Sequence, residues 1–317
     1  MHLDLPMEEL KHYRGKNPKP SDFDQYWSEA LAELDALPLD YEVTEADFRV
    51  EGMTLYHLTF TGIGGVTVHA KWAKPHQPTG QAVVMFHGYG VDSGDWLDKV
   101  AYAKEGIHVF AMDCRGQGGL SEDTIVTIGP TVRGHIIRGL KDKDPKNLYY
   151  RAVFLDTAQL VKIIQTIEGI DPQRIGSYGQ SQGGALALAV ASLVPEIKKT
   201  YSVYPFLSDY KRAWEMDVTN SAYEELSFYF RNVDPLHQFE EETFLKLGYI
   251  DLHHLAPRIE SDVIMVTGMR DNICPPSTQF AVFNHLTTKK THRLYLEHGH
   301  EYIPHHADEA FQFFKKL

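Results

Sequence analysis

The segment Gly-Gln-Ser-Gln-Gly at residues 179–183 constrains the fold more than any other part of this sequence. A short strand-like run precedes it, and residues 185–191 are an Ala-, Leu- and Val-rich run that favours a helix. A Gly-x-Ser-x-Gly motif between a strand and a helix predicts a strained turn that exposes Ser181 at the end of the strand. The glycines permit that tight turn. The backbone N–H of Gln182 then lies at a helix N-terminus, where it can stabilise an oxyanion.

The same motif also arises by chance in glycine-rich loops, so its surroundings decide its meaning. Alternating residues in 46–74 predict antiparallel strands at one edge of a sheet. Near-continuous apolar runs at 81–86, 108–113 and 263–268 are typical of parallel strands covered on both faces. Shorter strands are expected at 200–204 and 292–296, and helical periodicity appears at 149–168 and 307–316. The pattern predicts an α/β protein of α/β-hydrolase fold, a mostly parallel central sheet with helices on both faces.

Residues 1–317 are expected to form a single domain with additions around the sheet. Residues 1–45 are interpreted as an N-terminal helical extension, because Phe23, Trp27, Leu31 and Leu34 fall on one helical face. Residues 208–257 exceed what a crossover helix needs, and they predict a helical insertion before the next strand, either a cap or an oligomer interface. Residues 120–148 have no clean period and predict a long excursion over the site or an interface.

The composition narrows the possible partners and the compartment. A formal net charge of −12 argues against nucleic acid or an anionic membrane surface as a partner. Two cysteines, Cys114 and Cys274, are too few for a disulfide framework, although both follow predicted strands and can be neighbours in space. The first residues lack the basic start and apolar core of a signal peptide, and no apolar run approaches the length of a membrane span. We therefore expect a cytoplasmic protein.

Ser181, Asp271 and His300 have the order that a serine hydrolase of this fold requires. Each follows a predicted parallel strand, and the carboxyl ends of such strands meet at one edge of the sheet. His300 is expected to act as the general base for Ser181. Asp271 is expected to hold the imidazole in the correct tautomer and to stabilise the imidazolium.

Other candidates fit less well. Asn272 cannot carry the charge, and Asp262 precedes its strand and so lies at the wrong end of the sheet. His298 is the main rival for the base. A metal site made of His298, His300, His305 and His306 is disfavoured, because a metal would want carboxylate or thiolate partners at fixed geometry. No metal and no cofactor is predicted.

The His-Gly-Tyr sequence at 87–89 follows a buried strand, in the place where such hydrolases supply the second oxyanion N–H. We assign that N–H to Tyr89, with the phenol ring as a wall of the acyl site and His87 as a support for the loop. Phe206 and Ile273, also on loops after strands, are expected to narrow the acyl pocket. Arg115 either binds an anionic substrate group or, as we prefer, forms an internal ion pair that holds its loop.

Several motifs together extend over essentially the whole chain: His87-Gly88-Tyr89, Arg115-Gly116-Gln117, the motif around Ser181, Asp271 with Cys274-Pro275-Pro276, and Gly299-His300-Glu301. In this combination the sequence resembles the acetyl xylan esterase/cephalosporin C deacetylase family of carbohydrate esterases. The resemblance implies that Arg115, Gln117 and Glu301 are structural motif residues. It also implies a cytoplasmic serine esterase that removes acetyl groups from short xylo-oligosaccharides and cephalosporin C-like compounds, and a hexamer.

Two other functions stay open at this point. One is a general short-chain carboxylesterase or a peptidase of the same fold, which longer acyl chains or peptide amides would reveal. The other is a non-catalytic binding protein, against which the intact set of Ser181, Asp271 and His300 argues.

Overall fold

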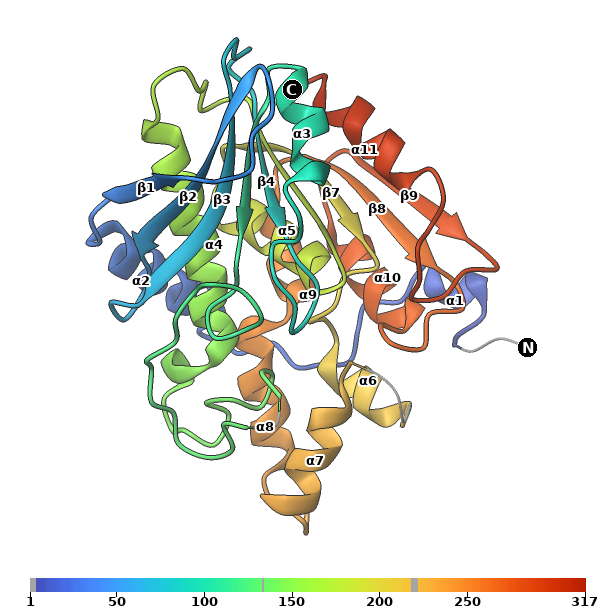
Figure 1. The fold of residues 1–317 in the computed structure, drawn as a ribbon. Coiled ribbons are helices and arrows are strands. Elements are labelled where there is room, and N and C mark those ends of the chain that lie inside the picture. Colours follow the sequence, from blue (N-terminus) through green and yellow to red (C-terminus); the bar gives the residue numbers. More distant parts are fainter. Residues whose placement is uncertain (1–3, 133, 218–221) are drawn as a thin grey trace.

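A nine-stranded sheet runs through the residues that the computed structural model describes, namely 4–132, 134–217 and 222–317 (Figure 1). The strands are β1 (Tyr41–Glu45), β2 (Met53–Thr61), β3 (Thr67–Pro75), β4 (Ala82–Phe86), β5 (His108–Met112), β6 (Ile175–Gln180), β7 (Ile197–Val203), β8 (Asp262–Gly268) and β9 (Lys290–Tyr295). Their order is β1-β2-β3-β5-β4-β6-β7-β8-β9. The β1–β2, β2–β3 and β3–β5 pairs are antiparallel, and all remaining pairs are parallel. The sheet is therefore mostly parallel with an antiparallel edge, as the sequence predicts.

The central strand β4 explains why its sequence is apolar without interruption. Ala82, Val84 and Phe86 pack into one hydrophobic core, whereas Val83 and Met85 pack into a second core on the other face. Successive side chains of a strand point to opposite faces, so a strand covered on both sides needs apolar residues at every position. All five are buried.

Helices cover both faces of the sheet. The helices are α1 (Met7–Leu10), α2 (Phe23–Asp35), α3 (Leu97–Lys104), α4 (Tyr149–Thr166), α5 (Gln182–Leu193), α6 (Tyr210–Glu215), α7 (Glu224–Asn232), α8 (Glu240–Leu247), α9 (Leu252–Leu255), α10 (Pro276–His285) and α11 (His306–Phe314), with short 3₁₀ turns at Pro145–Asn147, Gly248–Ile250 and Ala256–Arg258. The first core contains side chains of α2, α4, α5, α9 and α10, and the second contains those of α3 and α11. No helix in the described ranges is both long enough and apolar enough to span a bilayer.

Some boundaries differ from those expected. The first strand begins at Tyr41, so residues 41–45 of the predicted extension belong to the sheet. The alternating stretch predicted to form strands over 46–74 begins too early: residues 48–50 belong to the connection between β1 and β2, where Gly52 turns the chain with a φ of 85°. Periodicity alone cannot distinguish such a connection from a strand, because Phe48 and Val50 also alternate.

Two long segments lie at the edge of the sheet where the parallel strands end (Figure 1). One joins β5 to α4 and contains the excursion expected at 120–148. The other carries α6, α7 and α8, which shows that the predicted insertion is largely helical. Residues 1–3 of the extension, 133 of the excursion and 218–221 of the insertion lie outside the described residues.

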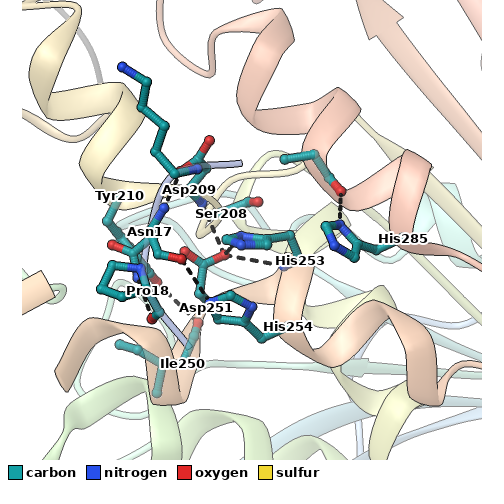
Figure 2. Close-up of polar contacts among 12 residues, drawn as sticks. Asn17, Pro18, Ser208, Asp209, Tyr210, Ile250, Asp251, His253, His254 and His285 are labelled. Carbon is teal, nitrogen blue, oxygen red and sulfur yellow. Dashed lines mark hydrogen bonds and ion pairs between the residues drawn. The ribbon is translucent and has the colours of Figure 1, made fainter. Parts of the chain in front are cut away.

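A buried polar cluster attaches the N-terminal segment to the insertion (Figure 2). The backbone N–H groups of Lys16 and Asn17 each donate to Asp209 Oδ1 at 2.9 Å. The N–H of Asp209 donates to Asp251 Oδ1 at 3.0 Å, and His253 Nδ1 lies 2.6 Å from the same oxygen. Because Asp209 follows β7 closely, this cluster connects the N-terminal segment to a loop that borders the candidate site.

Candidate active site

Ser181 stands at the turn between β6 and α5 with a backbone conformation that few residues adopt. Its φ is 57° and its ψ is −120°, and it directly precedes the first residue of α5. Such a conformation costs on the order of 1–3 kcal/mol and persists only where the surroundings fix it. Here the N–H of Ser181 donates to the carbonyl of Val203 at 2.9 Å, and the N–H of Phe206 donates to the carbonyl of Ser181 at 3.1 Å.

The glycines of the motif are required by close backbone contacts. A Cβ on Gly179 would lie 2.2 Å from the carbonyl carbon of Gly183, and one on Gly183 would lie 2.0 Å from the carbonyl oxygen of Phe86. Neither neighbour is a movable side chain. The helix therefore approaches β4 and β6 closely enough to bring Ser181 next to the loop after β4.

The structure brings Ser181, His300 and Asp271 into one hydrogen-bonded chain. His300 Nε2 lies 3.0 Å from Ser181 Oγ, and His300 Nδ1 lies 2.9 Å from Asp271 Oδ2. The three residues come from the loops after β6, β8 and β9, as expected from parallel strands that end at one edge. His298, the rival histidine, packs its ring edge-on against Tyr295 instead.

Asp271 is fully buried and its second oxygen is also engaged. Oδ1 accepts hydrogen bonds from the N–H groups of Ile273 and Cys274, each at 2.8 Å. This arrangement leaves Oδ2 facing His300 and fixes the plane of the carboxylate. The ring of Tyr204 lies 4.4 Å from the ring of His300 and covers one of its faces.

The thiol of Cys274, which the sequence places just after a predicted strand and near the catalytic loops, is a hydrogen-bonding neighbour of Ser181. Its pKa is raised well above the ordinary value, first by burial and then by the charge of Asp271, while a hydrogen bond with Ser181 opposes the rise. The thiol is therefore protonated at neutral pH. Cys114 is also buried and unpaired, and burial likewise raises its pKa.

The loop after β4 is held by its own histidine and by the side chain of Gln182. His87 Nε2 accepts from the N–H of Cys114 at 2.9 Å, and burial lowers the pKa of the His87 imidazole. The amide of Gln182 is buried, and its Nε2 lies 3.4 Å from the carbonyl oxygens of both His87 and Gly88. The loop that carries Tyr89 is thereby attached to Gln182, the first residue of α5. This attachment keeps the backbone N–H groups of Tyr89 and Gln182 in a fixed relation, as two donors to one oxyanion require.

Gln117 connects the loop after β5 to the loop after β4 and to Gln182. Its Oε1 accepts from the N–H of Gly90 at 2.9 Å, and its Nε2 donates to Gln182 Oε1 at 2.8 Å and to Tyr149 Oη at 3.0 Å. A smaller contact involves Glu301, whose Oε1 accepts from the N–H of Gly299 at 3.1 Å beside His300.

Arg115 forms an internal ion pair. Its Nε and Nη2 reach the two oxygens of Asp156 at 2.7 and 2.6 Å, and Nη2 also donates to the carbonyl of Ile63 at 3.0 Å. Both residues are buried, Arg115 at 1% and Asp156 at 0% exposure. No motif in the sequence points to Asp156 as its partner, because Asp156 lies in the apolar helix α4.

The hydroxyl of Tyr89 is hydrogen-bonded to Glu225, a residue of the insertion that the sequence analysis did not identify. This hydroxyl donates to Glu225 Oε1 at 3.2 Å and accepts from the N–H of His135 at 3.0 Å. Glu225 Oε2 accepts from the N–H of Ile137 at 3.1 Å, and burial raises the pKa of this carboxyl to about 7. Glu225 thus connects α7, the excursion and the predicted oxyanion loop.

Two hollows border Ser181 and His300. One, of about 350 Å³, extends past Gln180 and Tyr204, and the other, of about 570 Å³, extends past Tyr89 and Ile273. Phe206 is fully buried and contacts the ring of Tyr89 edge-on at 5.9 Å. It therefore supports the wall that Tyr89 forms and does not itself line the larger hollow.

These features define a class before any relative is considered: a strained serine turn with a hydrogen-bonded His and Asp on a mostly parallel sheet is the arrangement of an α/β-hydrolase. The sequence model of the acetyl xylan esterase family (AXE1) matches residues 1–317. The chain therefore belongs to the acetyl xylan esterase family, and the predicted resemblance and fold are confirmed.

Solved structures of similar proteins agree over almost the full length. The acetyl xylan esterase 1 of Thermoanaerobacterium sp. is 47% identical, with a TM-score of 0.96 and 99% of both chains covered. The acetyl xylan esterase of Paenibacillus sp. R4 is 33% identical, with a TM-score of 0.93 over 99% of this chain and 100% of that one.

A further relative is similar in sequence. The acetyl esterase Axe7A of Xylanibacter ruminicola is 27% identical over 89% of this chain, and the matched part spans 63% of the length of that relative.

Proposed function

We propose that this protein is a serine esterase that removes acetyl groups from small acetylated saccharides. The observation that carries the proposal is the chain Ser181–His300–Asp271, with contacts of 3.0 and 2.9 Å, at a glycine-bounded turn in a member of the acetyl xylan esterase family. Family relatives are named for acetyl ester chemistry.

The proposed reaction has two steps. In the first, Ser181 Oγ attacks the acetyl carbonyl carbon while His300 Nε2 takes the hydroxyl proton, and the N–H groups of Tyr89 and Gln182 stabilise the oxyanion. His300 then gives that proton to the sugar oxygen as the C–O bond breaks, which leaves acetyl-Ser181. In the second, His300 takes a proton from water, the hydroxide oxygen attacks the acetyl carbon, and acetate leaves as Ser181 regains its proton. Asp271 stabilises the imidazolium in both steps, and no cofactor or metal takes part.

The selectivity for acetyl is assigned to Tyr89 and Ile273, which line the larger hollow, with Phe206 behind Tyr89. We extend the substrate class to small acetyl esters of other alcohols, such as cephalosporin C, because the attack requires only the acetyl group and a leaving oxygen. Release of acetate from cephalosporin C tests this extension.

The proposed assembly is a hexamer in the cytoplasm. The family resemblance supports the hexamer, and the excursion offers apolar side chains for an interface, since Val126 is 91% and Val132 97% exposed. The free thiols of Cys114 and Cys274 suit a reducing compartment. The molar mass measured by light scattering during size-exclusion chromatography tests the hexamer, and cell fractionation tests the compartment.

The experiment that tests the function is hydrolysis of a nitrophenyl ester series, acetate through octanoate, beside release of acetate from acetylated xylo-oligosaccharides. The control is Ser181→Ala, for which we expect a loss on the order of 10⁴ to 10⁶ in kcat with the fold intact. Activity confined to acetate and lost in the variant supports the proposal. Activity on long chains or peptide amides replaces it with a general carboxylesterase or a peptidase, and a folded, inactive protein replaces it with a binding protein.

A further inference from the structure

The ring of Tyr204, which directly follows β7, lies against the ring of His300. The two ring centroids are 4.4 Å apart, and the ring planes are tilted by 48°. Tyr204 has a φ of 33°, a left-handed value that is strained for a residue with a bulky side chain. Its N–H donates to the carbonyl of Val266 at 2.7 Å, which fixes the backbone in this conformation. Strained residues of this kind cluster at functional sites.

The contact of His300 with its acid leaves the imidazole a motion that the neighbouring ring restricts. The hydrogen bond between His300 Nδ1 and Asp271 Oδ2, at 2.9 Å, fixes one point about which the imidazole can still tilt. Tilting would move Nε2 away from Ser181 Oγ, which lies 3.0 Å from it. Tyr204 blocks the tilt toward its own side, because its ring occupies that face. An aromatic face also attracts a cation, so the same ring stabilises the imidazolium that forms in each proposed step.

The hydroxyl of Tyr204 is held by Gln180, the residue directly before Ser181. Tyr204 Oη donates to Gln180 Oε1 at 2.8 Å. Burial raises the pKa of the Tyr204 phenol, so the hydroxyl keeps its proton and is available as the donor. Gln180 Nε2 donates in turn to Tyr178 Oη at 2.9 Å. The side chain of Gln180 therefore lines the hollow of about 350 Å³ with both ends of its amide engaged.

His306, the first residue of α11, determines which way round the Gln180 amide lies. Its Nδ1 is 2.5 Å from the carbonyl oxygen of Ile303, which can only accept, so Nδ1 carries a proton. In a neutral imidazole, Nε2 is then an acceptor. That atom lies 3.1 Å from Gln180 Nε2, which donates to it, and Gln180 Oε1 is left for Tyr204. The hydrogen bonds thus fix the amide in the orientation that holds the ring on His300.

We infer that Tyr204 is a positioning residue for His300 and is itself oriented by Gln180. The inference rests on the proposed function, because that function makes His300 the base for Ser181. Ile303, at the far end of these contacts, is fully buried in the second core. The ring on His300 is therefore fixed to a part of the fold that does not move independently. Proton transfer needs its two heavy atoms within hydrogen-bond reach, which this restraint maintains for Nε2 in both steps.

The test compares Tyr204→Leu with Tyr204→Phe in the full chain. Tyr204→Leu removes the ring, and kcat for nitrophenyl acetate should fall about tenfold, because an aromatic face beside a cation is worth several-fold in rate. KM should stay within about twofold, since ground-state binding is unchanged. Tyr204→Phe keeps the ring and should restore kcat to within about threefold of the wild-type value, the size of one lost hydrogen bond. The matched control is Tyr201→Phe, which removes a hydroxyl that donates from β7 to Glu309 and should change neither constant.

A second measurement separates positioning from contact with the substrate, because Tyr204 and Gln180 both line a hollow beside Ser181. Methanesulfonyl fluoride reacts once with the serine: the Oγ–S bond forms, the S–F bond breaks, fluoride leaves, and His300 takes the hydroxyl proton. Fluoride cannot fill the hollow as a sugar or a nitrophenol would. The rate of inactivation should therefore fall in Tyr204→Leu by the same factor as kcat.

Gln180→Leu keeps the approximate size of the side chain but removes its hydrogen bond with Tyr204. We expect kcat to fall about threefold or more. Tyr204→Phe combined with Gln180→Leu should lose no more than Gln180→Leu alone, because both changes break the same hydrogen bond. This comparison decides the question if Tyr204→Leu fails to fold, and losses that multiply would overturn the inference.

Three other results would also overturn it: a wild-type kcat in Tyr204→Leu, a rise in KM that accounts for its whole loss in kcat/KM, or a Tyr204→Phe protein no more active than Tyr204→Leu. Failure of the proposed function has a different signature. A protein that hydrolyses no acetyl ester but is sulfonylated at Ser181 would refute the esterase alone, since the rate of sulfonylation still measures the effect of Tyr204. A protein in which Ser181 does not react at all would refute both.

Discussion

Asp271→Asn offers the sharpest test of how the site holds its histidine. Asp271 Oδ1 accepts from the N–H groups of Ile273 and Cys274, each at 2.8 Å. In the variant, the amide oxygen must take this position, because an amide nitrogen there would face two donors. The NH₂ group then points at His300 Nδ1, which lies 2.9 Å from the Oδ2 position.

An amide donor at that position reverses the tautomer of His300. Nδ1 becomes the acceptor, so the proton moves to Nε2, the atom 3.0 Å from Ser181 Oγ. An Nε2 that carries a proton cannot take the one on Ser181. The same exchange in a serine protease lowers kcat about 10⁴-fold, which corresponds to about 5.4 kcal/mol in the activation free energy. We expect a loss of this size here.

The assay is steady-state hydrolysis of nitrophenyl acetate near pH 7.5, with thermal unfolding to verify that the variant is folded. Because no wall of either hollow changes, kcat and kcat/KM should fall together. Asp262→Asn is the matched control, since Asp262 is at the opposite end of β8 and pairs with Lys289 at the surface. An Asp271→Asn protein that keeps more than about a tenth of its activity would refute the reasoning, as would an equal loss in the control.

Three other perturbations have expected outcomes. Ile273→Ala removes side-chain volume from the larger hollow and should raise kcat/KM for propionate and butyrate esters relative to acetate. Asp156→Asn leaves the Arg115 guanidinium buried without its counter-charge, which should lower the unfolding free energy by about 3–5 kcal/mol and the midpoint in a calorimetric scan by about 4–8 °C for a chain of this length. Glu225→Gln should remove a pH dependence of stability. The folded pKa of Glu225 is raised to about 7 from 4.5, so its contribution is fully present below pH 4.5 and is lost, on the order of 3 kcal/mol, as pH rises through 7.

Each of these three predictions would be contradicted by a particular observation. An unchanged acyl preference in Ile273→Ala would remove this residue from the acyl pocket. A change below about 1 kcal/mol in Asp156→Asn would mean that the pair is solvated, as exposed ion pairs are. For Glu225, the unfolding free energies of both proteins are compared at pH 4.5 and pH 8. The groups that face this carboxyl are the hydroxyl of Tyr89 and the backbone N–H groups of His135, Ile136 and Ile137 in the excursion. An equal fall in both proteins would assign the pH dependence to other groups.

The parts of the site that the sequence predicted share one property: each is tied to a motif or to the end of a strand. The chain order of Ser181, Asp271 and His300 predicts, among several carboxylates and histidines, the three side chains that the structure joins by hydrogen bonds, because parallel strands end at one edge. The sheet and most helices followed from apolar periodicity. The exact boundaries of these elements did not follow from periodicity. Residues 48–50 show why, because apolar residues also alternate in a connection that only turns the chain.

The parts that escaped prediction depend on contacts between distant segments. Glu225 is 136 positions from Tyr89, and with Glu224 beside it at the start of a helix, it has the pattern of an exposed face. Asp156 lies in a helix whose neighbours are apolar, and only the fold shows that it meets Arg115. Phe206 follows a strand, as lining residues often do, but it packs behind Tyr89. In all three cases the deciding partner comes from another element of the fold.

These distant contacts explain how the strained turn at Ser181 is maintained. The cost of its conformation, on the order of 1–3 kcal/mol, must be offset by neighbours that cannot move independently. Gln182 supplies this restraint, since it reaches the loop after β4 directly and the loop after β5 through Gln117. Arg115 fixes the latter loop through its buried pair with Asp156 on α4. The rigidity of the turn that carries Ser181 therefore originates in a helix that contributes no residue to the proposed chemistry, and Asp156→Asn should reduce kcat as well as stability.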